Sequence, residues 1–385
     1  MAEATQTKTT IAIDPVTRIE GHLKAEVVVE NGKVVDAKLT GGMYRGFESI
    51  LRGRHPRDAA QIVQRICGVC PTAHATAASI ALEKASGTAV PSNGRATRNL
   101  ILGANYLQSH ILHFYHLAGQ DFIQGPDTAP FMPRYAKPDL RLPPAINAVG
   151  VDQYVEALEV RAVCHEMVAL FGGRMPHVHG ILAGGAAEIP TKEKLVEYAA
   201  RFKKVRKFVE EKYLPVVYLV GSQYKDLGAF GQGYRNALCV GVFPLDDEGK
   251  EFVFKAGAYQ DGKDMPFDVK RVTEDVKFSW FADSTSGKPF TKGENVLEVD
   301  KKGAYSFVKA PLYNGKPMEV GPLARMWVNN KPISPIGQKL FKEYFGLDVK
   351  NFRDMGEDLA FSLLGRHVAR AEESYLMLDV VERFL

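Results

Sequence analysis

The sequence predicts an α+β fold that is predominantly α, with a helical-bundle core, an N-terminal β-hairpin and an inserted antiparallel β subdomain. Long segments carry apolar residues at spacings of three and four, which is the pattern of an amphipathic helix. Near the N-terminus, two alternating runs flank Asn31-Gly32, a two-residue turn signal. Between residues 228 and 330, Gly, Asp and Lys increase and short β-like runs replace the helical periodicity.

The first ninety residues are expected to contain strands followed by helices. Residues 10–14 are expected to form a strand and residues 24–39 the hairpin. Residues 57–66 have a helical pattern. Pro71 suits the first turn of a second helix, which is expected to end near Gly87.

The rest of the chain is expected to alternate helices with connecting segments. Helices are expected at residues 95–122, 152–171, 191–213, 334–345 and 357–384. Thr191 is placed to cap the third of them. The proline-rich residues 123–150 are expected to form a long loop. These expectations divide the chain into residues 1–227, the β-rich insertion 228–330, and C-terminal helices over 331–385.

Composition limits the classes of function. The 385 residues are 45% hydrophobic, enough for a large core, and the formal net charge is only +4. Lys and Arg are scattered rather than clustered, which weighs against a nucleic-acid partner. No apolar run approaches the length of a transmembrane segment. The polar N-terminus, MAEATQTKTT, lacks a hydrophobic signal core, so any export is expected to depend on a partner.

The four cysteines are too few for a disulfide framework. Cys164 and Cys239 stand alone in apolar segments and are expected to be buried as small hydrophobic residues. Cys67 and Cys70 form a CxxC at the expected junction of two helices, where helix ends favour thiolates. The spacing alone fits a metal site, a redox dithiol or structural cysteines. His74, four residues after Cys70, is expected on the same helix face.

Three motifs near the N-terminus occur in a fixed order: DPVTRIEGH (14–22), RGFE (45–48) and RICGVCPTAH (65–74). The set resembles motifs of the large subunit of nickel–iron hydrogenases. The resemblance continues through HFYHL (113–117), GGRMPH (172–177), EVGPLARMW (319–327) and GRHVARAEE (365–373). It covers nearly the whole chain. The motif sequences are most similar to those of the nickel–iron–selenium branch, in which one nickel ligand is usually selenocysteine.

The resemblance implies roles for five residues. Cys67 takes the place of a terminal nickel ligand, and Cys70 that of a bridge between nickel and iron. The iron would carry carbon monoxide and cyanide, installed by maturation proteins. Glu20 matches a carboxylate that transfers protons, and Glu48 a ligand of a second metal, Mg²⁺ or Fe²⁺. His74 matches a histidine beside the bridging cysteine, where an N–H donor would tune the basicity of the thiolate.

Several of these residues also have simpler explanations. Glu20 could be a capping carboxylate or pair with Arg18, and Glu48 could be a surface acid at a turn. His110, His113 and His116 recur every third residue and could suggest a ladder of ligands. Such a spacing drifts around a helix, so they are expected to be mostly hydrogen-bonded interior or interface histidines. Ser109 stands where many nickel–iron members have an aspartate.

The function implied is reversible heterolytic cleavage of H2 to protons and electrons at a binuclear nickel–iron centre. The carboxylate of Glu20 could relay protons only if burial raised its pKa. The chain has too few cysteines for an iron–sulfur electron relay, so an iron–sulfur small subunit is expected as partner. That subunit carries the export signal in many members, which implies a periplasmic heterodimer, with a cytoplasmic one as the alternative.

One departure from the family pattern is large. The second CxxC that the family carries close to its C-terminus does not occur in this sequence, which therefore supplies two of the four nickel-binding chalcogens. A shortened sequence, a split protein and an inactive remnant would each explain this. Two other functions are a quinone-module subunit like that of complex I and a non-catalytic scaffold. Cys67 and Cys70 weigh against the first, and the presence of both Cys67 and Glu20 against the second.

Overall fold

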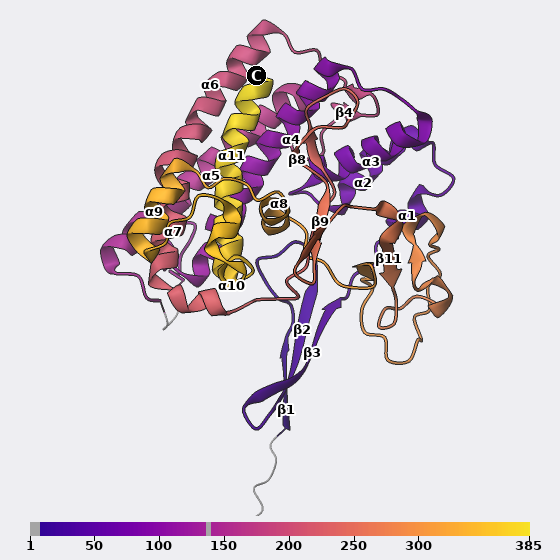
Figure 1. Ribbon diagram of the computed structural model, residues 1–385, viewed down its shortest axis with the longest axis horizontal. Helices are drawn as coiled ribbons and strands as arrows, with labels where there is room; N and C mark the ends of the chain where they lie inside the picture. The colour runs from indigo at the N-terminus through magenta and orange to yellow at the C-terminus, as the bar shows by residue number, and fades with distance from the viewer. Residues whose placement is uncertain (1–7, 136–139) are drawn as a thin grey trace, which may run out of the picture. The chain divides into compact units, whose positions relative to one another are not determined.

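The computed structural model describes residues 8–135 and 140–385, so most of the N-terminal MAEATQTKTT segment and the middle of the expected loop lie outside it. The described residues are mostly helical with small antiparallel sheets, which confirms the predicted fold class (Figure 1). The chain forms two compact units. Unit 1 combines residues 1–52 with 268–318, and unit 2 combines residues 53–267 with 319–385.

Unit 1 begins with the predicted hairpin. Strands β1 (Lys8–Ile13), β2 (Leu23–Glu30) and β3 (Lys33–Gly41) form an antiparallel sheet in the order β1-β2-β3. The turn residues Asn31 and Gly32 have φ of 52° and 75°. Both lie in the left-handed region that a type I′ hairpin turn requires, and Asn and Gly are the residues that adopt it at least cost.

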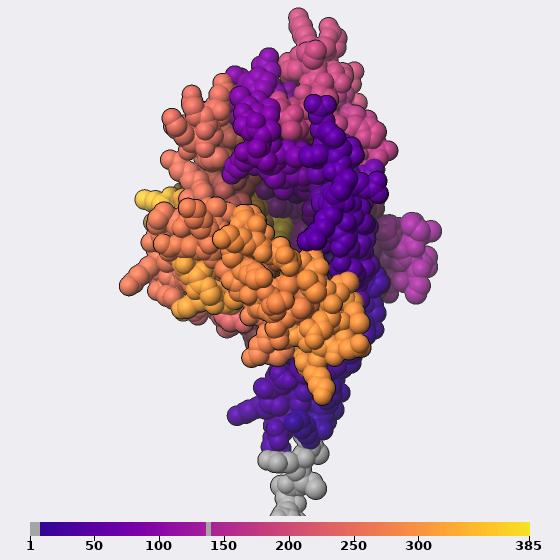
Figure 2. All heavy atoms as spheres, turned by 90° about the vertical axis from the view of Figure 1, so that its right-hand side faces the viewer, coloured from indigo at the N-terminus to yellow at the C-terminus, as the bar shows by residue number. Residues whose placement is uncertain are grey.

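The second stretch of unit 1 packs against this hairpin. It contains β11 (Val272–Asp275), β12 (Lys288–Pro289) and β13 (Ala310–Tyr313), in the order β12-β11-β13. Gly41 donates its N–H to Ser306 Oγ at 3.0 Å and accepts the N–H of Phe307 at 2.9 Å, so the two stretches meet (Figure 2). The β-rich residues 228–330 therefore contribute to both units. The three-part division by residue number did not anticipate this long-range pairing.

Unit 2 holds the helical core and most of the helices; the short α1 (Phe47–Leu51) belongs to unit 1. Its helices are α2 (Ala59–Val63), α3 (Pro71–Ser86), α4 (Ser92–Leu112), α5 (Pro144–Gly172), α6 (Lys192–Phe208), α7 (Leu214–Gln223), α8 (Pro322–Val328), α9 (Pro335–Phe345), α10 (Glu357–Ala360) and α11 (Leu363–Phe384). Helix α4 packs against α3, α5 and α11. Its residues Leu100, Ala104, Leu107 and Ile111 are at most 1% exposed, as their spacing predicted.

Short strands complete unit 2. They are β4 (Ile181–Leu182), β5 (Gly185–Ala186), β6 (Ala237–Cys239), β7 (Val242–Pro244), β8 (Phe252–Phe254), β9 (Gly257–Gln260) and β10 (Lys263–Met265). They pair antiparallel as β10-β9-β6, β4-β5 and β7-β8. The antiparallel character expected for this part of the chain is confirmed.

Two expected helices change geometry near their ends. The helix expected to reach residue 122 continues after α4 as a π-helix over His113–Ala118, and α6 continues as a π-helix over Val209–Tyr213. The rings of Phe114 and Tyr213 lie 5.5 Å apart, so the two π-helical segments pack against each other. Spacings of three and four in the sequence do not distinguish such a turn from an α-helix.

The boundaries of the other helices follow from their capping residues. Thr191 Oγ1 accepts the N–H of Lys194 at 3.4 Å, as predicted for the start of α6. Helix α5 begins at Pro144, inside the segment expected to be a loop, so that expectation was wrong at its end. Proline at the first helical position lacks only an N–H that would have no partner in the helix, and Pro144 marks the start of a helix rather than a break.

A buried carboxylate joins three helices of unit 2. Glu373 on α11 is fully buried; one of its oxygens accepts Arg325 Nη2 of α8 at 2.8 Å and lies 2.7 Å from His110 Nε2 of α4. Burial raises the pKa of Glu373, but the Arg325 guanidinium and the hydrogen bonds outweigh it and hold the pKa at about 2. Burial lowers the pKa of His110, so the neutral ring donates to the carboxylate. His110 is thus a hydrogen-bonded interior histidine, as expected.

The next residue along α11 has the opposite shift. Glu372 is also buried and accepts Tyr218 Oη at 2.5 Å and the N–H of Ser334 at 2.7 Å. Burial raises the pKa of Glu372 to about 7, because none of these partners carries a positive charge. Two adjacent glutamates on one helix therefore titrate in different pH ranges.

We expect Glu373→Gln and Glu372→Gln to change the pH dependence of stability in opposite directions. A pKa lowered from 4.5 to about 2 stabilises the fold by about 3 kcal/mol above pH 4.5, and this stability is lost as the pH falls toward 2. Glu373→Gln removes that acid-sensitive contribution. Glu372 instead destabilises the fold as the pH rises from 4.5 to 7, so Glu372→Gln relieves a loss at neutral pH. Urea unfolding between pH 3 and 8 measures both; equal profiles for the two variants would contradict this account.

Candidate metal centre

The CxxC lies at the junction that the sequence predicted. A 3-10 turn over Gln64–Ile66 ends at Cys67, whose backbone is extended, and α3 begins at Pro71 with Cys70 at its N-cap. Both cysteines are half-buried and free of disulfide bonds. The positive end of the α3 dipole therefore lies at Cys70.

The backbone of this loop turns two donors toward one sulfur. The N–H groups of Val69 and Cys70 both point to Cys67 Sγ, each with an N···S distance of 3.3 Å. The thiolate is the form of cysteine that binds metal, and N–H groups directed at its sulfur can donate hydrogen bonds to it. Two thiolates on one short loop suit a soft transition metal such as nickel or iron. The donor set present thus fits a nickel–iron centre.

His74 lies in the same unit, four residues after Cys70 on the first turns of α3. It is half-buried, and burial lowers the pKa of its imidazole. The neutral ring has one N–H donor and one acceptor nitrogen.

The two predicted carboxylates belong to unit 1. Glu20 is exposed at a bend between β1 and β2, two residues after Arg18, whose φ is 58°. Glu48 is exposed in the first turn of α1. The structure thus brings Cys67, Cys70 and His74 into one unit and describes Glu20 and Glu48 in the other.

Cys164, Cys239 and His116 lie in the interior of unit 2. Cys164 on α5 and Cys239 on β6 are 0% and 2% exposed, which confirms them as core residues. Burial raises the pKa of Cys164 to about 12. His116 hydrogen-bonds to the Tyr154 carbonyl at 3.1 Å, as expected of an interior histidine. Within residues 8–135 and 140–385, no three His, Cys, Asp or Glu side chains are grouped to hold a metal, so the CxxC is a two-thiolate site there.

Sequence reasoning missed one residue that touches the loop. Gln108 on α4 is fully buried and donates from Nε2 to the Val69 carbonyl at 3.0 Å. In the sequence it is one of several polar residues on α4, among them Asn99, Asn105 and His110. No local pattern distinguishes it.

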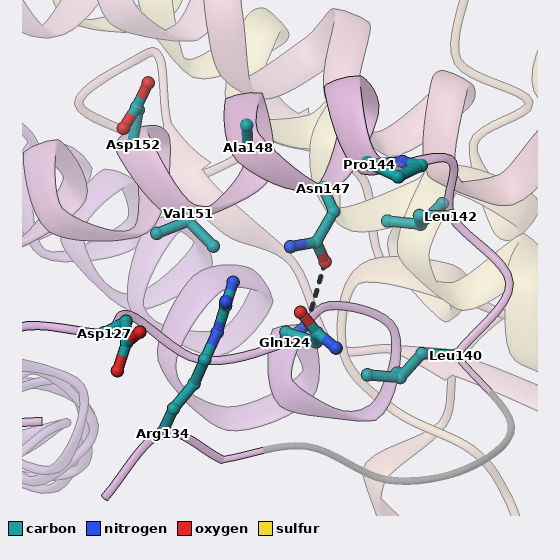
Figure 3. A pocket seen from close by; sticks show the side chains of 10 residues that line it. All are labelled: Gln124, Asp127, Arg134, Leu140, Leu142, Pro144, Asn147, Ala148, Val151 and Asp152. Atoms are coloured by element: carbon teal, nitrogen blue, oxygen red, sulfur yellow. Dashed lines mark hydrogen bonds between the residues drawn. The ribbon is translucent and has the colours of Figure 1, made fainter. Parts of the chain in front are cut away.

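A cavity of about 410 Å³ lies at the start of α5 (Figure 3). Its wall includes Arg134 and the carboxylates Asp127 and Asp152, and Asn147 Oδ1 accepts the N–H of Gln124 at 2.9 Å. The lining contains no cysteine or histidine, so it offers no soft ligands. Among the described helices, none combines the length and the apolar character needed to cross a bilayer.

Comparison with known proteins identifies the family of this chain. A family model described as nickel-dependent hydrogenase matches residues 45–126 and 122–385, and one described as HoxL-like matches residues 10–40. The chain belongs to the nickel-dependent hydrogenase family. It is 59% identical to the periplasmic [NiFeSe] hydrogenase large subunit of Desulfomicrobium baculatum, over 98% of this chain and 75% of that protein.

Other relatives agree with this assignment. The hydrogenase-2 large chain of Escherichia coli K12 is 33% identical over 83% of this chain and 67% of its own length. The Ni-Fe-Se hydrogenase structure from D. vulgaris Hildenborough is 70% identical with a TM-score of 0.95, covering 98% of this chain and 79% of that one.

The family sets the activity. This hydrogenase large subunit is an oxidoreductase that acts on H2 at a nickel–iron centre, and hydrogenase large subunits pair with a small subunit. The complex I-like and scaffold alternatives are not favoured, because the relatives are hydrogenases along almost the whole chain.

We expect Cys164 to react far more slowly than Cys67 and Cys70 when nickel is withheld. Iodoacetamide should modify the half-buried Cys67 and Cys70 in the folded protein. Cys164 should react only after denaturation, because a pKa of about 12 leaves roughly one thiolate in 10,000 at pH 8. Peptide mass spectrometry of protein from nickel-free cultures measures each site. If Cys164 were labelled before Cys67 and Cys70, Cys164 would not be the buried core residue described above.

Proposed function

We propose that Cys67 and Cys70 supply two of the thiolates that hold the nickel–iron centre, Cys67 as a terminal nickel ligand and Cys70 as the bridge to iron. The observation that carries this proposal is the pair of backbone N–H groups converging on Cys67 Sγ beside Cys70 at the start of α3. When bound, a nickel–iron centre supplies the Lewis acidity and redox capacity needed to split H2. The loop contributes negative sulfur ligands in a fixed arrangement.

We expect Cys67→Ser and Cys70→Ser each to abolish hydrogen oxidation and most of the bound nickel, because a hydroxyl is a poor ligand for a soft metal. Nickel and iron should be measured by elemental analysis on the purified complex. Cys164→Ala is the control, since Cys164 is fully buried in the core and should leave the metal content unchanged. Full nickel occupancy in Cys67→Ser would overturn the proposal.

Proton transfer is assigned in this proposal to Glu20. The support is its position in the RIEGH motif and the ability of a carboxyl group to exchange protons at a pKa near the working pH. The side chain is exposed in the single chain, where it can exchange protons with its surroundings. His74 would donate an N–H toward the Cys70 thiolate.

We expect Glu20→Gln to slow hydrogen oxidation about 100-fold while nickel content stays at the wild-type level, because an amide cannot carry a proton between donors and acceptors. Glu20→Asp should retain part of the activity. Asp36→Asn, an exposed carboxylate on β3 of the same unit, is the matched control. If Glu20→Gln kept wild-type turnover with full metal loading, another group would have to transfer the proton.

The proposal extends to the iron ligands, a second metal, the partner subunit and the location of the enzyme. Carbon monoxide and cyanide on the iron are installed by maturation proteins, and Glu48 binds a second metal, Mg²⁺ or Fe²⁺. Electrons leave through an iron–sulfur small subunit, since beyond Cys67 and Cys70 this chain has only two buried thiols. The location is the periplasm, by export together with that subunit, as the name of the D. baculatum relative suggests; the cytoplasm is the alternative.

A further inference from the structure

We propose that Gln108 is a positioning residue that fixes the peptide joining Val69 to Cys70, and so aims its N–H at the Cys67 sulfur. The proposal rests on the assignment of Cys67 as a metal ligand. It adds Gln108, near the C-terminal end of α4 and distant in sequence from the CxxC, to the residues that influence the charge on the Cys67 sulfur.

All four hydrogen-bonding positions of the Gln108 amide are used. Nε2 donates to the Val69 carbonyl at 3.0 Å and to Asn105 Oδ1 at 3.2 Å. Oε1 accepts Arg161 Nε of α5 at 3.3 Å and lies 3.4 Å from His165 Nε2. The residue is 0% exposed, so water cannot reach the amide and these protein partners satisfy its hydrogen bonds.

The partners leave the amide only one orientation. A guanidinium can donate but cannot accept, so the atom facing Arg161 must be the oxygen. Burial and the nearby Arg161 charge lower the pKa of His165 to about 4, and the neutral ring still has one N–H to give. The NH2 group therefore faces Val69. Helix α5 thus orients Gln108, and Gln108 in turn holds the loop.

Gln108 binds the carbonyl of the same peptide whose N–H donates to Cys67 Sγ. The Val69 carbonyl and the Cys70 N–H are the two ends of one planar trans peptide, so they point in opposite directions. The carbonyl end accepts Gln108 Nε2, and the N–H end donates to Cys67 Sγ at 3.3 Å. Rotation of this peptide would break both bonds together. A hydrogen bond at the carbonyl also polarises the peptide and strengthens its N–H as a donor.

The consequence is electronic as well as structural. An N–H donated to a thiolate withdraws negative charge from the sulfur and stabilises the more reduced state of the metal it binds. Removing Gln108 frees the peptide to turn away, so the sulfur becomes more electron-rich. The nickel midpoint potential should then become more negative.

The test compares Gln108→Leu and Gln108→Glu in the assembled holoenzyme. Leucine removes the donor; glutamate keeps the shape and the contact with Arg161 but turns a second oxygen toward the Val69 carbonyl, where only a donor fits. We expect both variants to shift the nickel midpoint potential, followed by electron paramagnetic resonance during a redox titration, to more negative values. We also expect nickel retention in the presence of a chelator to fall roughly 10-fold.

The matched control is Tyr198→Phe. Tyr198 is also fully buried and donates to a backbone carbonyl of the same region, Leu100 of α4, at 2.9 Å. Its loss should lower stability without moving the potential. Wild-type potential and nickel retention in both Gln108 variants would overturn the proposal and leave the Cys67 assignment intact, whereas full nickel in Cys67→Ser would overturn the assignment itself. If Gln108→Leu does not assemble, nickel retention in the isosteric Gln108→Glu decides, because its added negative charge alone would not weaken nickel binding.

Discussion

The convergence of two backbone N–H groups on Cys67 Sγ is the interaction on which the proposed metal site depends. A short loop does not hold such a geometry by itself, because each of its peptides can rotate. Here the loop is fixed at one end by the start of α3 at Pro71 and in its middle by Gln108 of α4. The precision of the sulfur environment therefore derives from helices packed around it.

Helix α4 is in turn fixed by buried polar groups as well as by its apolar face. Burying ionised groups is costly unless they are paired, and the Glu373 carboxylate meets both Arg325 and His110. These bonds connect α4 to α8 and α11, while Arg161 of α5 connects to Gln108. Because α4 is held by these bonds, its Gln108 side chain is held in place against the CxxC loop. Substitutions in this network should therefore disturb the CxxC loop without changing Cys67 or Cys70.

The parts of the fold that the sequence predicted are those set by local chemistry. Asn31-Gly32 specifies its turn, Thr191 caps α6, and Pro71 begins α3, because each depends on a few neighbouring atoms. The CxxC junction followed from the same signals, and the ordered motifs around it identified the family. These features need no knowledge of distant residues.

The parts that escaped prediction depend on distant contacts. The junction of Gly41 with Ser306 unites two stretches of unit 1 that are far apart in sequence. The π-helical turn after α4 is packed against a second one at Tyr213, and apolar spacing does not reveal it. The contact between the Gln108 amide and the Val69 carbonyl could not be predicted from the sequence. The sequence alone does not show which distant residue a polar side chain on a helix contacts.

The most direct test of the central claim is nickel K-edge X-ray absorption on the purified complex, comparing the native protein with Cys67→Ser. We expect a first shell of sulfur or selenium scatterers in the native protein. Any nickel that the variant retains should show one sulfur scatterer fewer. An unchanged shell in the variant, or a native shell made only of nitrogen and oxygen, would contradict the claim that this loop holds the metal.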